Sequence, residues 1–216
     1  MAVNNTSLVD KNQAYWNGAA KIIFKDNWVH NLQKQISDFL VSNLDWTGVQ
    51  LPSNDSKRRT KLMDCACDNK IVYMSLHHLF SKCIGIDVSD GRLDKYRATA
   101  ASLGLPEHRM IAVQVNLLAP TRLASRLRPG GVFLIIDWAT RDSSAVNQHA
   151  SPDAVNPEHP AAFTISHDIF TQEQIVGLFD QAGCGDARFV LADRILDVPG
   201  AGSGKMQLFW GWANKF

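Results

Sequence analysis

The sequence lacks several features that mark specialised classes of protein. No window approaches the roughly 20 consecutive apolar residues that a membrane-spanning helix needs. The first residues, MAVNNTSLVDKNQ, lack the charged and then apolar pattern of a secretion signal. With 22 basic and 21 acidic residues, the formal net charge of +1 gives no broad electrostatic field to attract nucleic acid or a membrane surface. We therefore expect a cytoplasmic protein that binds neither nucleic acid nor a membrane.

Cysteine is also scarce, since the chain has only Cys65, Cys67, Cys83 and Cys184. The spacing of Cys65 and Cys67 is compatible with a metal site, but no second close pair of cysteines and no matching pair of histidines accompanies it. Buried free thiols in a reducing compartment explain these residues better. We therefore expect no metal site.

The size and composition of the chain are those of one globular domain. Its 216 residues are 45% hydrophobic and 20% charged, which is enough to bury a full core. Residues 1–60 are expected to form an N-terminal helical cap, because apolar residues recur at helical spacing and predict a helix over 27–44. Residues 61–216 are expected to form the core of the same domain.

The predicted core alternates strands with helices. Strands are expected at 61–67, 82–88, 109–115 and 132–137, with helices between them near 70–80, 92–103 and 121–127. Ser89 is placed to cap the helix that follows the second strand. The apolar run VFLIID at 132–137 is typical of a parallel strand that is covered on both faces.

The C-terminal part of the sequence predicts one helix and a hairpin. Thr171 and Gln174 have the spacing of a capping box for a helix over 172–182. Segments 188–197 and 206–214 are typical of two antiparallel strands at the edge of a sheet. The whole pattern predicts an α/β protein with a Rossmann-like, doubly wound, mostly parallel sheet and a C-terminal antiparallel hairpin. Ligands in such sheets bind at the carboxyl ends of the strands.

The order of these motifs resembles the class I S-adenosylmethionine-dependent methyltransferases, in particular the fungal-like enzymes that act on small molecules. The resemblance covers most of the chain, from about Tyr15 onward. It rests on six stretches: MDCAC at 63–67, CIGIDVSDG at 83–91, the helix with DKY at 94–96, LRPGGVFLIID at 127–137, the segment 163–183 and MQLFWGWANK at 206–215.

The resemblance implies a site for S-adenosylmethionine at the ends of the first three strands. The residues that it assigns to this site are Asp64, Cys67, Asp68, Asp87, Val88, Asn116 and Leu117. Asp87 would accept hydrogen bonds from the ribose hydroxyls, Asn116 would meet the adenine, and Asp64 would flank the methionyl end. Each has an alternative interpretation: Asp87 as an acid at a helix N-terminus, Asn116 as a turn residue, and Asp64 as a partner of Lys61 or of nearby arginines.

The sequence departs from the family's pattern in two places. Asp68 and Lys70 stand where the family's first turn has glycines, so side chains occupy space that the cofactor would need. Any positive φ in this turn would cost about 1 kcal/mol or more without glycine. Between Asn116 and Leu127 the chain is too short for the family's usual fourth strand, so six strands are expected instead of seven. The strand at 132–136 would then fill the vacant place beside the first strand.

The resemblance also implies candidates for the chemistry of methyl transfer. His167 is a candidate general base, and Asp137, at the end of a strand, is a candidate to orient the substrate or an ordinary turn residue. Tyr15, Trp16 and Trp138 would contact the substrate, with core packing as the alternative. We expect a methyltransferase for a small organic molecule, such as a secondary metabolite, in a monomer or weak homodimer. The alternatives are a cofactor-independent cyclase or isomerase of the same fold and a non-catalytic pseudoenzyme.

Overall fold

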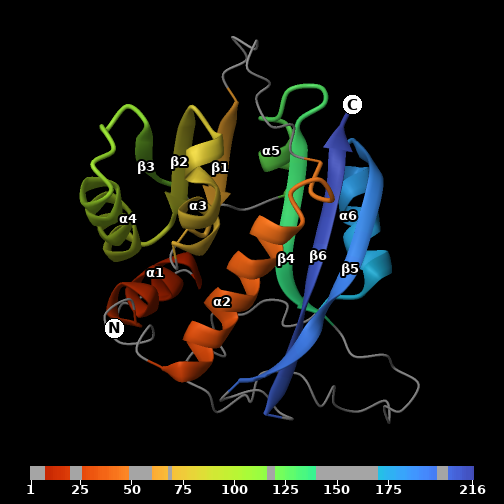
Figure 1. Cartoon of the computed structure of the whole chain (residues 1–216), viewed down its shortest axis with the longest axis horizontal. Coiled ribbons are helices and arrows are strands. Elements are labelled where there is room, and N and C mark those ends of the chain that lie inside the picture. The colour runs from red at the N-terminus through yellow and green to blue at the C-terminus, as the bar shows by residue number, and fades with distance from the viewer. Residues whose placement is uncertain are drawn as a thin grey trace, which may run out of the picture. The chain divides into compact units, whose positions relative to one another are not determined.

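The computed structural model describes residues 8–19, 26–48, 60–67, 70–115, 120–139, 170–198 and 204–216. The chain divides into two compact units, Met1–Leu117 and Leu118–Phe216. Each unit contains one three-stranded sheet, as Figure 1 shows. The six strands of the described residues and their order along the chain agree with the predicted α/β class. The sequence predicted that residues 132–136 lie beside the first strand. These two strands belong to different units, so this pairing stays a prediction, and so does the single domain.

The first unit is built on a parallel sheet with the order β1-β2-β3. Its strands are β1 (Lys61–Cys65), β2 (Lys82–Asp87) and β3 (Met110–Gln114). The connecting helices are α3 (Ile71–Leu76), which continues into a 3-10 turn over His77–Leu79, and α4 (Asp90–Ser102). The predicted strands and crossover helices are therefore confirmed, with ends that differ by at most two residues when the 3-10 turn is counted with α3.

Strand β2 and helix α4 approach each other closely at Gly85. A Cβ atom added there would lie 2.6 Å from the ring of Tyr96, which is itself buried. Tyr96 also meets Tyr73 of α3 edge to face, with 4.3 Å between the ring centroids. Glycine is required in the middle of this strand because the tyrosine ring fills the space of a side chain.

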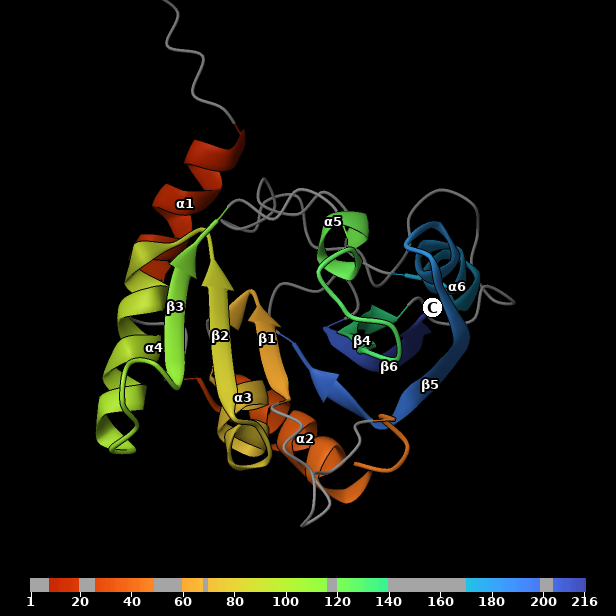
Figure 2. The same cartoon turned by 90° about the horizontal axis from the view of Figure 1, so that it is seen from above.

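In the part of the chain that the structure describes, two helices precede the first strand. The predicted helix over 27–44 is confirmed as α2 (Asn27–Ser42), which buries Val29, Ile36 and Leu40 along one face. It packs against α3, where the Ser75 hydroxyl lies 2.9 Å from that of Ser37. Helix α1 (Leu8–Ala19) lies next to α4, beyond the arrowheads of the parallel strands in Figure 2. It therefore lies at the edge of the sheet where the strands end.

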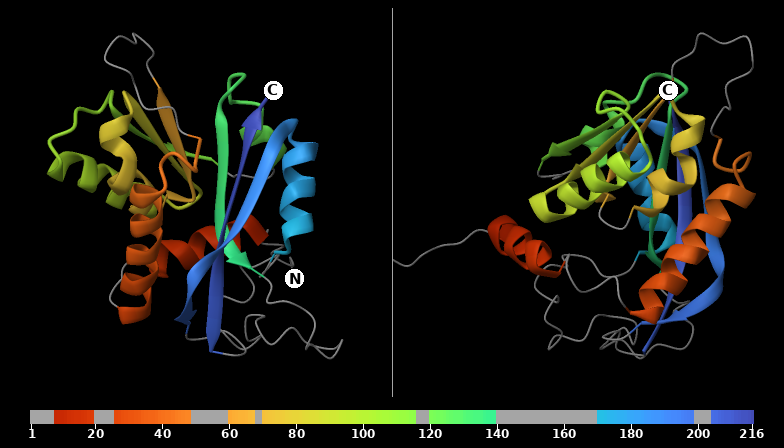
Figure 3. Two further views of the ribbon diagram at one scale, coloured as in Figure 1. Left: turned by 45° about the vertical axis from the view of Figure 1, so that its right-hand side comes forward. Right: turned by 60° about the vertical axis from the view of Figure 1, so that its left-hand side comes forward.

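The second unit contains an antiparallel sheet with the order β4-β6-β5. Its strands are β4 (Val132–Ala139), β5 (Cys184–Asp197) and β6 (Lys205–Lys215), so the predicted C-terminal hairpin is confirmed. Helix α6 (Gln172–Gln181) lies along one face of this sheet, as the left panel of Figure 3 shows, and the short helix α5 (Pro120–Ala124) precedes β4.

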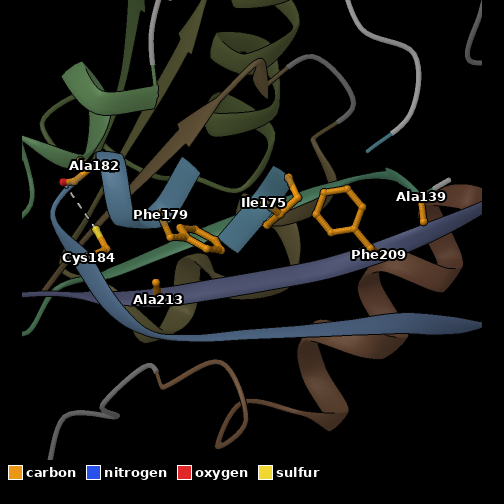
Figure 4. Packing of buried hydrophobic residues seen from close by; sticks show 8 residues of the cluster. Ala139, Ile175, Phe179, Ala182, Cys184, Phe209 and Ala213 are labelled. Atoms are coloured by element: carbon orange, nitrogen blue, oxygen red, sulfur yellow. Dashed lines mark hydrogen bonds between the residues drawn. The ribbon is translucent and has the colours of Figure 1, made fainter. Parts of the chain in front are cut away.

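Helix α6 is fixed by its cap and by the core beneath it. The predicted capping box is present: the Thr171 hydroxyl accepts from the Gln174 N–H at 3.2 Å, and the Gln174 side chain accepts from the Thr171 N–H at 2.8 Å. Figure 4 shows Ile175 and Phe179 of this helix directed at the β-sheet, where Phe209 belongs to the same buried cluster. Within the described residues, no helix is both long enough and apolar enough to cross a membrane.

We expect Gly85→Ala to lower the free energy of unfolding by about 1–3 kcal/mol, because the added methyl group overpacks the Tyr96 contact. Urea denaturation measures this change. Gly177→Ala in α6 is the control, since nothing lies within 4 Å of its added Cβ. It should raise the free energy of unfolding by up to about 1 kcal/mol through helix propensity. Equal effects of the two substitutions would contradict the close approach at Gly85.

Candidate cofactor site

Two carboxylates lie at the ends of the first two strands. Asp64 is the fourth residue of β1, and Asp87 is the last residue of β2. The register places Asp64 beside Gly85, so both acids are near the carboxyl edge of the parallel sheet. Both side chains are buried, with exposed fractions of 7% for Asp64 and 5% for Asp87. Buried carboxylates at this edge are unusual enough to mark a candidate site.

Asp87 is held by the backbone that follows it. The Ser89 N–H donates a hydrogen bond to Asp87 Oδ1 at 2.9 Å. Burial raises the pKa of Asp87, while hydrogen bonds from the backbone N–H groups of Ser89 and Val88 act in the opposite direction. The carboxylate is thus fixed in place at the junction of β2 and α4. This position agrees with both of its predicted roles, and its contact with a ribose stays a prediction.

Asp64 is the second buried carboxylate at this edge. Burial raises the pKa of Asp64 to about 7, although a hydrogen bond from the Tyr73 N–H lowers it, and the nearby Asp87 raises it further. The carboxyl group therefore changes its charge near neutral pH. Lys61, its alternative partner, is exposed at the other end of β1, and residues three apart on a strand point to opposite faces.

The turn after β1 has left-handed backbone conformations without any glycine. The φ angle is 56° at Ala66 and 66° at Lys70. Cys67 between them is buried, and its carbonyl accepts a 3.4 Å hydrogen bond from the Lys70 N–H. Asp68 lies outside the described residues. The turn thus adopts, at two positions, the conformation for which glycine is the usual residue.

Helix α1 brings two of the predicted substrate residues to this edge. Trp16 lies beneath the guanidinium group of Arg92, whose carbon is 4.1 Å from the ring centroid. Tyr15 meets Trp16 edge to face at 4.9 Å. Arg92 is only 4% exposed, and the sequence did not predict a buried arginine in α4. The aromatic pair and the arginine therefore form one group at the N-terminal end of α4.

Two further contacts of α1 were also missed. Asn17 Oδ1 lies 2.6 Å from Ser89 Oγ and accepts a hydrogen bond from the Gly91 N–H at 3.3 Å. Ser89 was predicted only as a helix cap, which is confirmed because its hydroxyl accepts from the Arg92 N–H at 3.3 Å. No local sequence pattern signals a contact between residues so far apart along the chain.

The remaining predicted residues lie in the second unit or outside the described residues. Asp137 and Trp138 belong to β4 of the second unit, where Asp137 Oδ1 accepts a hydrogen bond from the Trp138 N–H at 2.8 Å. Asn116, Leu117 and His167 lie outside the described residues. The roles of all five stay predictions. In the part of the chain that the structure describes, no group of three or more His, Cys, Asp or Glu side chains is arranged to hold a metal ion.

The fold matches solved structures far better than the sequence matches known sequences. No family profile and no curated protein sequence matches the chain. A geranyl diphosphate C-methyltransferase from Streptomyces coelicolor A3(2), solved with S-adenosyl-L-homocysteine, is similar over 98% of this chain and 99% of its own, with a TM-score of 0.63 and 14% identity. The chain has the class I methyltransferase fold. The resemblance that the sequence indicated is confirmed at the level of fold.

Proteins with this fold differ in what they do. A magnesium protoporphyrin IX methyltransferase from Synechocystis PCC 6803, with bound S-adenosylhomocysteine, has a TM-score of 0.62 at 12% identity and covers 97% of this chain and 100% of its own. The [4+2]-cyclase SpnF also has a TM-score of 0.62, at 11% identity, and covers 97% of both chains. The fold therefore leaves the reaction to be argued from the site.

We expect Lys70→Gly to raise the free energy of unfolding by roughly 1 kcal/mol, because glycine removes the cost of a left-handed backbone at this position. Urea denaturation measures the change, and Ala66→Gly should act in the same direction. Ala98→Gly on the exposed side of α4 is the control and should lower stability by about 1 kcal/mol. A loss of stability in Lys70→Gly similar to that in Ala98→Gly would contradict the left-handed backbone conformation at Lys70.

We expect Asp64→Asn to remove a pH dependence of stability. The folded protein holds the Asp64 proton more tightly than the unfolded chain, because its pKa rises from 3.8 to about 7 on folding. Its contribution to stability is complete below about pH 4 and is lost as the pH rises through 7. Between pH 4 and 8, the free energy of unfolding of the variant should therefore rise relative to that of the wild type, by up to about 4 kcal/mol.

The control for this experiment is Asp94→Asn in α4. Asp94 is exposed and pairs with Arg97 at 2.7 Å, so its loss should change stability by less than about 1 kcal/mol. A stability difference between Asp64→Asn and wild type that stays constant from pH 4 to 8 would show that the pKa of Asp64 is not raised.

Proposed function

We propose that the chain is an S-adenosylmethionine-dependent methyltransferase that acts on a small organic molecule, such as a secondary metabolite. The observation that carries the proposal is the position of Asp87. It is a buried carboxylate, fixed by the Ser89 N–H, at the end of the second parallel strand of a class I methyltransferase fold. A carboxylate there can accept hydrogen bonds from two vicinal hydroxyl groups, as on a ribose.

The described residues fit such a cofactor at its ribose end. Asp87 would bind the ribose, Val88 and Asn116 would lie on its adenine side, and Asp64 with Cys67 would lie on its methionyl side. When bound, the cofactor supplies a methyl group on a sulfonium ion. The protein would orient the substrate with Asp137 and Trp138, and His167 would take a proton from it.

A second candidate function is supported by the turn after β1. Ala66 and Lys70 carry side chains at two left-handed positions of this turn, where glycine would let a ligand approach the backbone more closely. A protein of this fold that no longer methylates would fit this observation, either as a cofactor-independent cyclase or isomerase or as a non-catalytic pseudoenzyme. The fold of the [4+2]-cyclase SpnF is compatible with the first of these.

The proposal also covers the localisation, the oligomeric state and the partners of the protein. We place it in the cytoplasm, as a monomer or weak homodimer whose partner is a small-molecule substrate. Its four cysteines support a reducing compartment, since all of them are free thiols and Cys67, Cys83 and Cys184 are buried. The balanced charge supports the absence of nucleic-acid and membrane partners.

We expect calorimetric titration with S-adenosylhomocysteine to show saturable binding with a Kd near 10 μM, about −7 kcal/mol. Asp87→Asn should raise the Kd by about tenfold or more, because hydrogen bonds to an ionised group contribute about 1.5–3 kcal/mol. Asp94→Asn, an exposed carboxylate of α4, is the control and should bind like the wild type. Absence of heat up to millimolar ligand, with a folded protein, would reject the cofactor site.

The mass of the product then separates the two candidate functions. A methyltransferase adds one methyl group to its substrate, whereas a cyclase or isomerase leaves the mass unchanged. The second function is favoured if the product has the same mass as the consumed substrate and no S-adenosylhomocysteine is formed.

A further inference from the structure

The last residue of β3 lies directly beside Asp87. Gln114 and Asp87 are partners in the register of the parallel sheet, and Figure 2 shows the ends of β2 and β3 side by side. Partners in neighbouring strands project their side chains from the same face, which here is the face that Gly85 presents to helix α4. The Gln114 side chain therefore lies on the side of the sheet where α4 begins.

The Gln114 amide connects β3 to the segment that joins β2 to α4. Its Nε2 atom donates one hydrogen bond to the Val88 carbonyl at 3.2 Å and another to Asp90 Oδ2 at 3.0 Å. Both partners are acceptors, so only the NH2 end of the amide can face them. Gln114 thus holds the two residues on either side of Ser89.

This segment determines the position of the Asp87 carboxylate. The Ser89 N–H donates a hydrogen bond to Asp87 Oδ1 at 2.9 Å, and the Asp87 carbonyl accepts one from the Val115 N–H at 3.0 Å. The carboxylate is therefore fixed by the backbone of Ser89, and both neighbours of Ser89 are held by Gln114. The glutamine acts on the carboxylate through this backbone.

The Gln114 contacts contribute more to geometry than to stability. Gln114 and Asp90 are both exposed, so water competes for the hydrogen bond between them and its net contribution to folding is small. A group that binds a ligand, by contrast, must be held within about 0.5 Å of its productive position. Loss of these contacts is therefore expected to change affinity more than stability.

We propose that Gln114 is a positioning residue for the ribose site and orients the Asp87 carboxylate through the segment 88–90. The proposal rests on the proposed function, because it takes Asp87 as the carboxylate that binds the cofactor. A glutamate cannot replace this glutamine, because its carboxylate has no donor and would face two acceptors, the Val88 carbonyl and the Asp90 carboxylate. Gln114 thus affects affinity through Asp87 and not by contact with the ligand.

Calorimetric titration with S-adenosylhomocysteine tests the effect on affinity. Gln114→Glu should raise the Kd about tenfold, because two hydrogen bonds are lost. Adding Asp90→Asn to this variant should lower the Kd again by about threefold, since an asparagine side chain at position 90 can donate to the glutamate. Gln181→Glu makes the same chemical change at an exposed position of α6 and should bind like the wild type.

Two readouts separate a positioning role from a merely structural one. The midpoint of urea unfolding of Gln114→Glu should stay close to that of Gln181→Glu. In an Asp87→Asn background, Gln114→Glu should raise the Kd by less than about twofold, because the carboxylate that Gln114 positions is gone. An undiminished effect in that background, or a clearly lower midpoint, would overturn the positioning role.

Amide exchange in the ligand-free protein tests the contact without any ligand. Gln114→Glu should increase hydrogen exchange at the Ser89 amide about fivefold to tenfold relative to Gln181→Glu, because the segment around Ser89 is released. Unchanged exchange at Ser89 would overturn the proposal, as would a normal Kd in Gln114→Glu. If the wild type binds no ligand, the proposed function fails, and the exchange result still decides whether Gln114 holds this segment.

Discussion

The junction between β2 and α4 depends on one buried serine. The N–H of Ser89 fixes the Asp87 carboxylate, and its hydroxyl both caps α4 through Arg92 and meets Asn17 of α1. Ser89 is buried, so each hydrogen bond that it makes replaces one that water cannot supply. The end of the central strand, the start of the following helix and the place of the N-terminal helix are therefore consequences of the same residue.

In the turn after β1, the residues that the fold accepts differ from those that a bound ligand would need. At Ala66 and Lys70 the backbone has the left-handed conformation, although both residues carry a Cβ. Packing of the surrounding sheet and helices is thus strong enough to impose this conformation without glycine. Glycine in this turn would lower the cost of the left-handed backbone, and it would also leave space next to the backbone, which matters only to a bound molecule. The Asp87 carboxylate and the turn are therefore two independent indications of whether the cofactor binds.

Local signals allowed much of the fold to be predicted. The capping box at Thr171 and Gln174, the serine cap at Ser89 and the periodicity of α2 depend on neighbours within a few residues, and all three are confirmed. The burial of Arg92 over Trp16 and the contact of Asn17 with Ser89 depend on residues about 70 positions apart, for which a single sequence has no periodic signal. Parallel strand order, by contrast, follows from the alternation of strands and helices, so the positions of Asp64 and Asp87 could be predicted. The raised pKa values of these two carboxyl groups could not be predicted, because burial in the folded protein causes them.

The buried thiols have a practical consequence for work with this protein. Burial raises the pKa of Cys83 to about 11 and that of Cys65 to about 12, and it acts in the same direction on Cys67 and Cys184. Only the thiolate reacts with alkylating reagents, and it is a minor form of these side chains at neutral pH. A single cysteine introduced on the exposed side of α4 can therefore carry a fluorophore or spin label selectively, without prior removal of the native cysteines.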